Sequence, residues 1–172
     1  MSELINRELL LRAFRRLGDE LGNDRVRAEL VLAGGAVIAL LFDTERVTRD
    51  DDGRILSGHG PLTKAARRIA GELGLPRGWL NEGVAMYLST KADPDRTVVF
   101  DHANLIIYAT SSEQMLALKA RAARAQDIGD LRLLAAALDI DTAAKVIAVV
   151  DRFFPNDPLN PKSLAVIEDL FD

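Results

Sequence analysis

The sequence predicts an α+β fold, in which a small mixed sheet packed with helices is followed by a C-terminal helical bundle. Helical and strand-like segments alternate up to residue 110, whereas every later segment with regular spacing is helical. The length of 172 residues suits one compact unit. We therefore assign residues 1–110 to an α/β core with an N-terminal helix, and residues 111–172 to a helical region of the same unit.

Composition narrows the class of protein. Hydrophobic residues make up 48% of the chain and charged residues 28%, as is ordinary for a soluble globular protein. No stretch is apolar over the length that spans a bilayer, the N-terminus lacks the order of a signal peptide, and there is no cysteine. We therefore expect a cytoplasmic protein without a membrane partner, disulfides or thiolate metal ligands. The net charge of −4 argues against tight non-specific binding to duplex DNA.

The first part of the chain predicts a helix, a strand and a second helix. Apolar residues at helical spacing mark 6–21 as an amphipathic helix with an asparagine N-cap. Residues 28–32 are almost continuously apolar, as in a strand covered on both faces. Gly34-Gly35 then permits a sharp turn and a close approach of the backbone to a ligand. A helix that starts near Ala36 would direct its free N–H groups toward this turn.

Two of the predicted helices have basic residues. On the helix 6–21, Arg12, Arg15 and Arg16 lie mostly off the apolar face. That position favours a solvated surface, and the alternative is a site that receives a polyanionic substrate. The next predicted helix, 62–73, has a basic side made of three residues: Lys64, Arg67 and Arg68.

The middle of the chain is predicted less directly. Pro76 and Gly78 interrupt the helical pattern, and 79–88 is expected to form a short helix. Its large side chains are expected in the core: Trp79, Met86 and Tyr87. Two β-rich runs, 96–100 and 104–108, then predict a hairpin with a tight turn.

The C-terminal part is predicted to be entirely helical. Ser111 and Gln114 fit a capping box, which opens a helix that continues with a kink to residue 138. Further helices are expected to begin near Thr142 and at Pro161, where Pro favours the first helical turn.

The acidic stretch after the second helix is the strongest candidate for chemistry. On a strand, Thr48, Asp50 and Asp52 share one face, and Asp51 takes the other. Two carboxylates about 7 Å apart along a strand suit Mg²⁺, which prefers oxygen ligands. The pair also suits a two-metal arrangement at a transferring phosphate. The alternative is an ordinary hairpin turn at Asp52-Gly53 between two β-prone runs.

The glycine pair followed by the acidic pair resembles the polymerase-β-like nucleotidyltransferase superfamily, whose signature is Gly-Gly or Gly-Ser followed by Asp-x-Asp. The likeness is closer to a minimal branch that includes the AbiEii-like and MenT-like toxins. In that branch an Arg-x-Thr precedes the acidic pair, as Arg46-Val47-Thr48 does here. A leucine-rich segment with a lysine and a later acidic element follow there, and 115–120 and 124–131 match them.

The resemblance implies a nucleotidyltransferase-type sheet and a divided site. Asp50 and Asp52 would hold Mg²⁺ or Mn²⁺, and Lys119 would meet the phosphates of the nucleotide. Asp127 or Asp130 would orient Lys119 or the acceptor. Gly34 and Gly35 would hold the triphosphate. Arg46 and Thr48 would support the site or contact phosphate.

The implied activity is metal-dependent transfer of an NMP group from an NTP to a tRNA-like RNA end or a protein hydroxyl, by a toxin with a cognate antitoxin. Two departures favour an alternative. Asp51 stands where the superfamily has an apolar residue, and the later strand lacks the usual third carboxylate, with Asp101 the nearest candidate. The alternative is a catalytically silent module of the same fold that binds a nucleotide or a partner. A purely structural helical adaptor is a third, weaker hypothesis.

Overall fold

The computed structural model describes residues 4–42, 45–49 and 51–172, which divide into two compact units. Unit 1 comprises Met1–Met86 and Arg96–Thr110, and unit 2 comprises Tyr87–Asp95 and Ser111–Asp172. The chain thus passes into unit 2 twice, first as a short segment and then for its whole C-terminal part. The architecture is α+β, as predicted.

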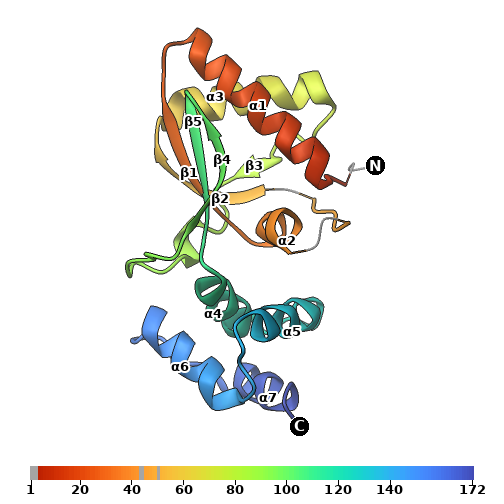
Figure 1. The fold of residues 1–172 in the computed structure, drawn as a ribbon, viewed down its shortest axis with the longest axis vertical. Helices are drawn as coiled ribbons and strands as arrows, with labels where there is room; N and C mark the ends of the chain where they lie inside the picture. Colours follow the sequence, from red (N-terminus) through yellow and green to blue (C-terminus); the bar gives the residue numbers. More distant parts are fainter. Residues whose placement is uncertain (1–3, 43–44, 50) are drawn as a thin grey trace. The chain divides into compact units, whose positions relative to one another are not determined.

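Unit 1 is built on a five-stranded mixed sheet (Figure 1). The strands lie in the order β3-β2-β1-β5-β4. Strand β1 pairs in parallel with β5 and antiparallel with β2, while β2 pairs in parallel with β3 and β4 antiparallel with β5. The bounds of the strands are β1 Ala28–Ala33, β2 Asp51–Ser57, β3 Leu80–Asn81, β4 Thr97–His102 and β5 Leu105–Ala109.

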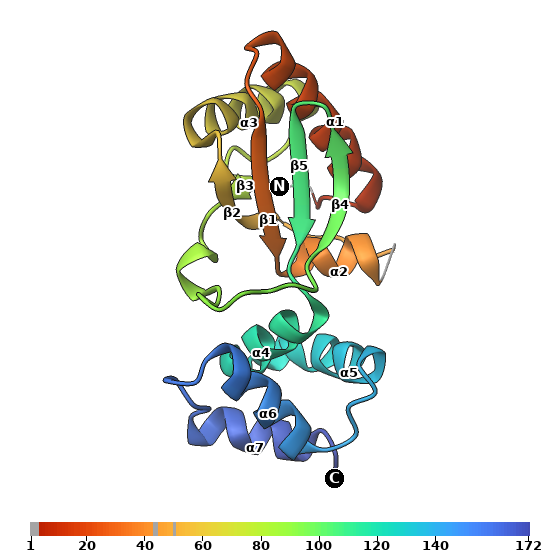
Figure 2. The ribbon, with the colours of Figure 1, turned by 60° about the vertical axis from the view of Figure 1, so that its left-hand side comes forward.

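Helices α1 (Arg7–Asn23) and α3 (His59–Leu73) lie against one face of this sheet, and α2 (Gly35–Leu41) follows the end of β1 (Figure 2). Burial alternates along β5, where Leu105, Ile107 and Ala109 are fully buried. On β5 the neighbours in between, Ile106 and Tyr108, are only half-buried. The fully buried core of this unit includes strand residues and residues of α1: Leu30, Leu32, Leu105, Ile107, Phe14 and Leu17.

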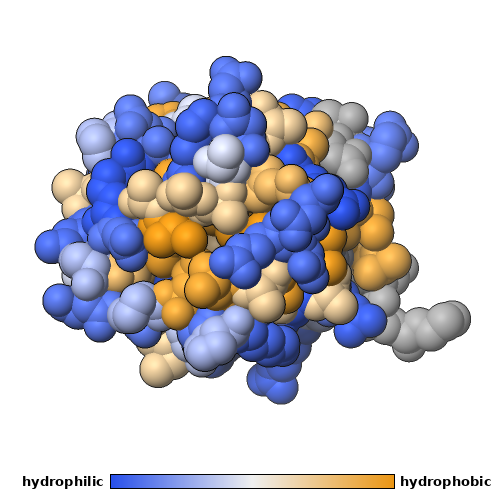
Figure 3. Space-filling view, turned by 90° about the horizontal axis from the view of Figure 1, so that it is seen from below, coloured by the Kyte–Doolittle hydropathy of each residue, from blue (hydrophilic) through white to orange (hydrophobic). Residues whose placement is uncertain are grey.

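Unit 2 contains helices α4 (Ser112–Ala122), α5 (Ile128–Ala137), α6 (Ala143–Phe153) and α7 (Pro161–Asp169), with a short 3₁₀ turn, η2 (Ala125–Asp127), before α5. A space-filling view from below shows hydrophobic side chains exposed among hydrophilic ones (Figure 3). The kink predicted after α4 is a complete break at Ala123, which has a left-handed backbone with φ 42°.

Side-chain caps fix where most of these helices begin. Asn6 accepts a hydrogen bond from the N–H of Leu9 at 2.9 Å, and Asn160 accepts one from Ser163. The Ser111 hydroxyl accepts from the Gln114 N–H at 3.1 Å, as the capping box predicts. These contacts lie within four residues of sequence, which is why local pattern was sufficient to place them.

The Gln114 side chain does not complete the capping box but fastens the segment 87–95 to α4. Its amide donates to Asp93 at 2.9 Å, and its carbonyl accepts the N–H of Ser89 at 3.1 Å. Asp93 also accepts the N–H of Ser111. These bonds explain why the segment belongs to unit 2.

The helix expected over 79–88 is wrong. Leu80 and Asn81 form the short strand β3, and only Ala85–Tyr87 make a single 3₁₀ turn, η1. Pairing with β2 overrides the local helical pattern. Trp79 is in the core as predicted, and its indole N–H donates to the carbonyl of Ala66 at 3.0 Å.

Met86 and Tyr87, which the helical pattern placed in the core, are instead 82% and 58% exposed. No helix in the described ranges combines the length and the apolar character that a membrane crossing requires.

Candidate functional site

The candidate site lies where β1 ends beside the start of β2. In the antiparallel register, Ala33 is opposite Asp52 and Leu32 is opposite Gly53. Asp52 and Gly53 are therefore inside a strand, and the hairpin-turn alternative is wrong. The close pairing requires glycine at 53, because a Cβ there would lie 2.7 Å from the carbonyl oxygen of Val31.

The glycine turn brings the backbone to Asp52. Gly34 has a φ of 77°, in the left-handed region that favours glycine, and it caps α2. A Cβ on Gly34 would lie 3.8 Å from the Asp52 Oδ2, and a Cβ on Gly35 would lie 3.1 Å from the Thr48 Oγ1. The structure thus brings together four of the residues chosen from sequence. Because α2 has only seven residues, the amides of the turn matter here more than a helix dipole.

Thr48 is held in place by the segment before α1. Its N–H donates to the carbonyl of Ile5 at 2.9 Å, and the N–H of Ile5 donates back to its carbonyl at 2.7 Å. Ile5 is fully buried, so this bridge anchors the loop to the core. Arg46, two residues earlier, is half-buried in the same loop.

Burial separates the acidic residues. Asp51 is fully buried, whereas Asp52 is half-buried on the other face of β2, beside the glycine turn. Position 51 therefore faces the core, where the resemblance implies an apolar residue. Asp50, the other carboxylate predicted to bind metal, lies outside the described residues.

Strand β3 contributes residues to the candidate site that the sequence analysis did not predict. Asn81 is paired with Asp52 in the parallel register, and its Oδ1 accepts the N–H of Gly83 at 2.8 Å. A Cβ on Gly83 would lie 3.7 Å from the Asp52 Oδ1, so the Asn81–Gly83 turn lies against the carboxylate. The one available signal was the turn-like order Asn-Glu-Gly, which the helical pattern of 79–88 masked.

Glu82, within that turn, closes the edge of β2. Its carboxylate accepts the N–H of Ile55 at 2.8 Å and forms a 2.7 Å hydrogen bond with Nε2 of His59. The side chain therefore extends the pairing of β2 beyond the two residues of β3.

Asp101 and His102 lie at the opposite end of the sheet. Ala109 pairs with Leu32 near the glycine turn, whereas Asp101 pairs with Ile106 at the end where β1 begins. Asp101 therefore does not supply the third carboxylate. The ring of His102 is 3.3 Å from Asp19 and packs against α1, which indicates a structural role. Within the ranges that the structure describes, no three His, Cys, Asp or Glu residues form a group that could hold a metal.

Unit 2 contains the other half of the predicted site as a buried ion cluster. The Lys119 Nζ lies 2.7 Å from the Asp127 Oδ1 and 2.8 Å from the Asp130 Oδ2. The lysine side chain is 11% exposed, and the two carboxylates are 1% and 4% exposed. Arg124, which is exposed, donates to the Asp127 Oδ2 at 2.8 Å. The structure therefore brings together the three residues chosen from sequence in this unit.

The cluster keeps Asp127 ionised. Burial on its own would raise the pKa of Asp127, but hydrogen bonds from Arg124 and Lys119, together with their charges, hold that pKa below its ordinary value. A buried carboxylate with two cationic donors is thus stable as an anion.

Comparison with protein-family models, with curated proteins and with solved structures finds no match to this chain.

Proposed function

We propose that this protein is a metal-dependent nucleotidyltransferase that moves an NMP group from an NTP to an RNA end or a protein hydroxyl. The observation that supports the proposal is the convergence of the Gly34 turn, Thr48 and Asp52 at the junction of β1 and β2. A glycine turn alone or an acidic strand alone would be weak support for a nucleotide site. In this chain the two features are adjacent in space and also follow each other in sequence.

The chemistry requires mainly positioning and charge neutralisation. The acceptor oxygen attacks the α-phosphorus, the bond to the β-phosphate breaks, and pyrophosphate leaves with the electron pair while the acceptor proton passes to a base. Main-chain N–H groups at Gly34 and Gly35 suit phosphate oxygens because glycine has no side chain of its own to obstruct a ligand. The half-buried Asp52 places negative charge beside them, which a metal ion would balance.

The donor set fits Mg²⁺ or Mn²⁺. Asp52 and Thr48 present oxygen atoms, and Mg²⁺ is typically bound through one or two carboxylates together with water and substrate phosphates. Asp52 would hold the ion, with Asp50 as the second ligand that the sequence predicts. The ion would supply charge neutralisation at the phosphates. Lys119, oriented by Asp127 and Asp130, is proposed to contact the nucleotide, and this role rests on the resemblance.

Transfer of label from each α-³²P-NTP to total tRNA and to cell protein tests the proposal. With Mg²⁺ present, the wild-type protein should label one acceptor, and Asp52→Asn should reduce labelling to background. Asp101→Asn is the matched control, because it removes the same charge from the other end of the sheet. Labelling by Asp52→Asn at the level of the control would refute the site.

A second candidate function is a catalytically silent nucleotide-binding module. Two observations favour it: Asp51 is buried at a core position, and Asp101 lies away from the glycine turn. Calorimetry that detects Mg²⁺-dependent NTP binding, with no labelled product, would support this function. Turnover of any NTP would exclude it. A role as the toxin of a toxin–antitoxin pair rests on the resemblance, and co-purification of a partner from the native host would test it.

A further inference from the structure

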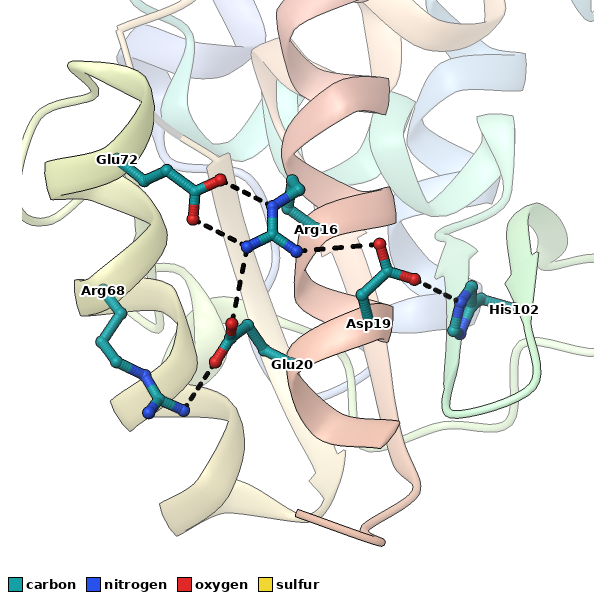
Figure 4. Close-up of polar contacts among 6 residues, drawn as sticks. All are labelled: Arg16, Asp19, Glu20, Arg68, Glu72 and His102. Carbon is teal, nitrogen blue, oxygen red and sulfur yellow. Dashed lines mark hydrogen bonds and ion pairs between the residues drawn. The ribbon is translucent and has the colours of Figure 1, made fainter. Parts of the chain in front are cut away.

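Two basic side chains along the seam between α1 and α3 are paired with carboxylates. Arg16 of α1 lies 2.7 Å from Glu72 of α3, and Arg68 of α3 lies 2.8 Å from Glu20 of α1 (Figure 4). The hydrogen bond with Arg16 is the main reason that the pKa of Glu72 is lowered. Arg16 is therefore engaged by carboxylates and is not available for the polyanionic substrate considered from sequence.

Arg67 and Arg77 differ from these residues. Both are exposed, and among the described residues no carboxylate lies within ion-pair distance of either guanidinium. Both line one open groove of about 440 Å³ between α3 and the segment that leads to β3. The other lining residues are uncharged: Thr63, Ala66, Gly78 and Leu80. Among the described residues, the lining of the groove therefore carries two positive charges and no negative one.

This groove lies beside a smaller cavity of about 130 Å³, and the two share Thr63, Ala66 and Leu80. The smaller cavity is also lined by Asn81, the residue paired with Asp52 across β2 and β3, and by Glu82. Its lining therefore includes a carboxylate, which the lining of the groove does not.

We propose that the Arg67–Arg77 groove binds the phosphates of a single-stranded nucleic acid. The guanidinium fork matches phosphate oxygens and stays charged at any physiological pH. No aromatic side chain in the described part of the chain lines the groove, so it would contact the backbone rather than stack on bases, and binding would depend little on sequence. The chain as a whole has a net charge of −4, so the attraction of the groove for phosphates comes from its own two arginines and not from the charge of the whole protein. That the bound strand is the acceptor of the transfer reaction rests on the proposed function.

The groove favours a strand over a free phosphate. It is open, and its two arginines come from different elements, with Arg67 on α3 and Arg77 after the end of that helix. An open groove with two separately positioned cations suits phosphates of one strand, because cationic grooves track the backbone of single-stranded nucleic acids.

Fluorescence anisotropy with a labelled single-stranded RNA of mixed sequence tests this proposal in the absence of NTP and divalent metal. Each phosphate neutralised on a single strand contributes about 0.7 to the slope of log affinity against log salt, so Arg67→Ala/Arg77→Ala should reduce its magnitude by about 1.4. Binding should weaken accordingly, and Arg67→Lys/Arg77→Lys should recover most of the slope because charge is retained.

The matched control is Arg12→Ala/Arg15→Ala, which removes two arginines that line a separate cavity on α1. We expect its binding to equal that of the wild type. Wild-type binding by the groove variant would overturn the proposal, as would a loss confined to the α1 variant or displacement of RNA by equimolar inorganic phosphate. Circular dichroism confirms that the variants are folded. Because no NTP is present, failure of the transfer assay and failure of this assay are separate results.

Discussion

The buried Lys119 cluster gives the sharpest test of the structure. Lys119→Met keeps the length and most of the apolar volume of the side chain but removes the ammonium that lies between Asp127 and Asp130. Two nearly inaccessible carboxylates then lose a cationic partner, and water does not reach them to compensate. We expect unit 2 to be strongly destabilised for this reason.

The magnitude follows from burial. Removing one partner of a buried ion pair costs about 3–5 kcal/mol, and we expect about 3 kcal/mol because Arg124 still bonds to Asp127. The chain offers a matched control in Lys145→Met. Lys145 pairs with Asp141 at 2.6 Å, but the two side chains are 54% and 73% exposed, and such pairs contribute about 0–1 kcal/mol.

Urea denaturation followed by far-ultraviolet circular dichroism is the assay, since the chain's one tryptophan, Trp79, belongs to unit 1 and does not report on unit 2. With a slope of about 1–3 kcal/mol per molar urea, Lys119→Met should lower the midpoint of the helical transition by about 1–3 M. At the same slope, Lys145→Met should lower it by at most about a third as much. Equal shifts for the two variants would refute the reasoning, because the cluster would then be hydrated.

The same cluster predicts a dependence on pH. The pKa of Asp127 is lower in the folded chain than its ordinary value of about 3.9, so its contribution to stability is present above that value and is lost as pH falls through the folded pKa. Asp127→Asn should therefore destabilise the protein most at neutral pH, and the difference from the wild type should shrink below about pH 4. A difference that is constant between neutral and acidic pH would contradict the assignment of Asp127 as a stabilised anion.

The remaining predictions concern glycines. Gly34→Ala must place a Cβ in the left-handed region beside Asp52, so it should cost about 1–2 kcal/mol and weaken NTP binding, as measured by thermal denaturation and calorimetry. Gly53→Ala would press a Cβ against a backbone carbonyl of β1 and should cost about 1–3 kcal/mol. Gly71→Ala in α3 meets nothing within 4 Å and should stabilise unit 1 by about 0.5–1 kcal/mol, with Trp79 fluorescence in urea as the readout for both.

Each glycine prediction has a clear contrary result. Wild-type stability of Gly34→Ala would mean that the turn is not left-handed. Equal midpoints for Gly53→Ala and Gly71→Ala would mean that β1 and β2 are not as closely paired as the register shows. The comparison of Gly53→Ala with Gly71→Ala uses the same substitution at two positions, so the effect of replacing glycine by alanine on the unfolded chain is the same in both variants.

Much of the fold could be predicted because its signals are local. The caps at Asn6, Ser111 and Asn160 bond to amides three residues away, and apolar spacing of 3.6 residues marks the helices that follow. The helix breaks at Gly74 and Ala123 have left-handed backbones, which at Gly74 is a residue preference visible in sequence. These features need no knowledge of distant contacts.

The segment around Trp79 could not be predicted in the same way. Its apolar residues fit helical spacing, but Leu80 and Asn81 gain more from pairing with the open edge of β2 than from an isolated turn of helix. Met86 and Tyr87 were expected in the core on the same helical pattern and are exposed. One wrong assignment of helical periodicity therefore gave the wrong structure or burial for four residues: Leu80, Asn81, Met86 and Tyr87.

The sequence by itself determined the order of the glycine turn, the acidic residues and the later lysine, and it placed Asp51 and Asp52 on opposite faces of a strand. The tertiary structure decided what each one touches. Only the register of β1 against β2 brings Asp52 to Gly34, and only β3 adds Asn81 beside it. Likewise, neighbouring arginines on α3 differ because Arg68 meets Glu20 while Arg67 faces an open groove. Strand register and ion pairing are set by residues far apart in the chain, so no local pattern of residue types specifies them.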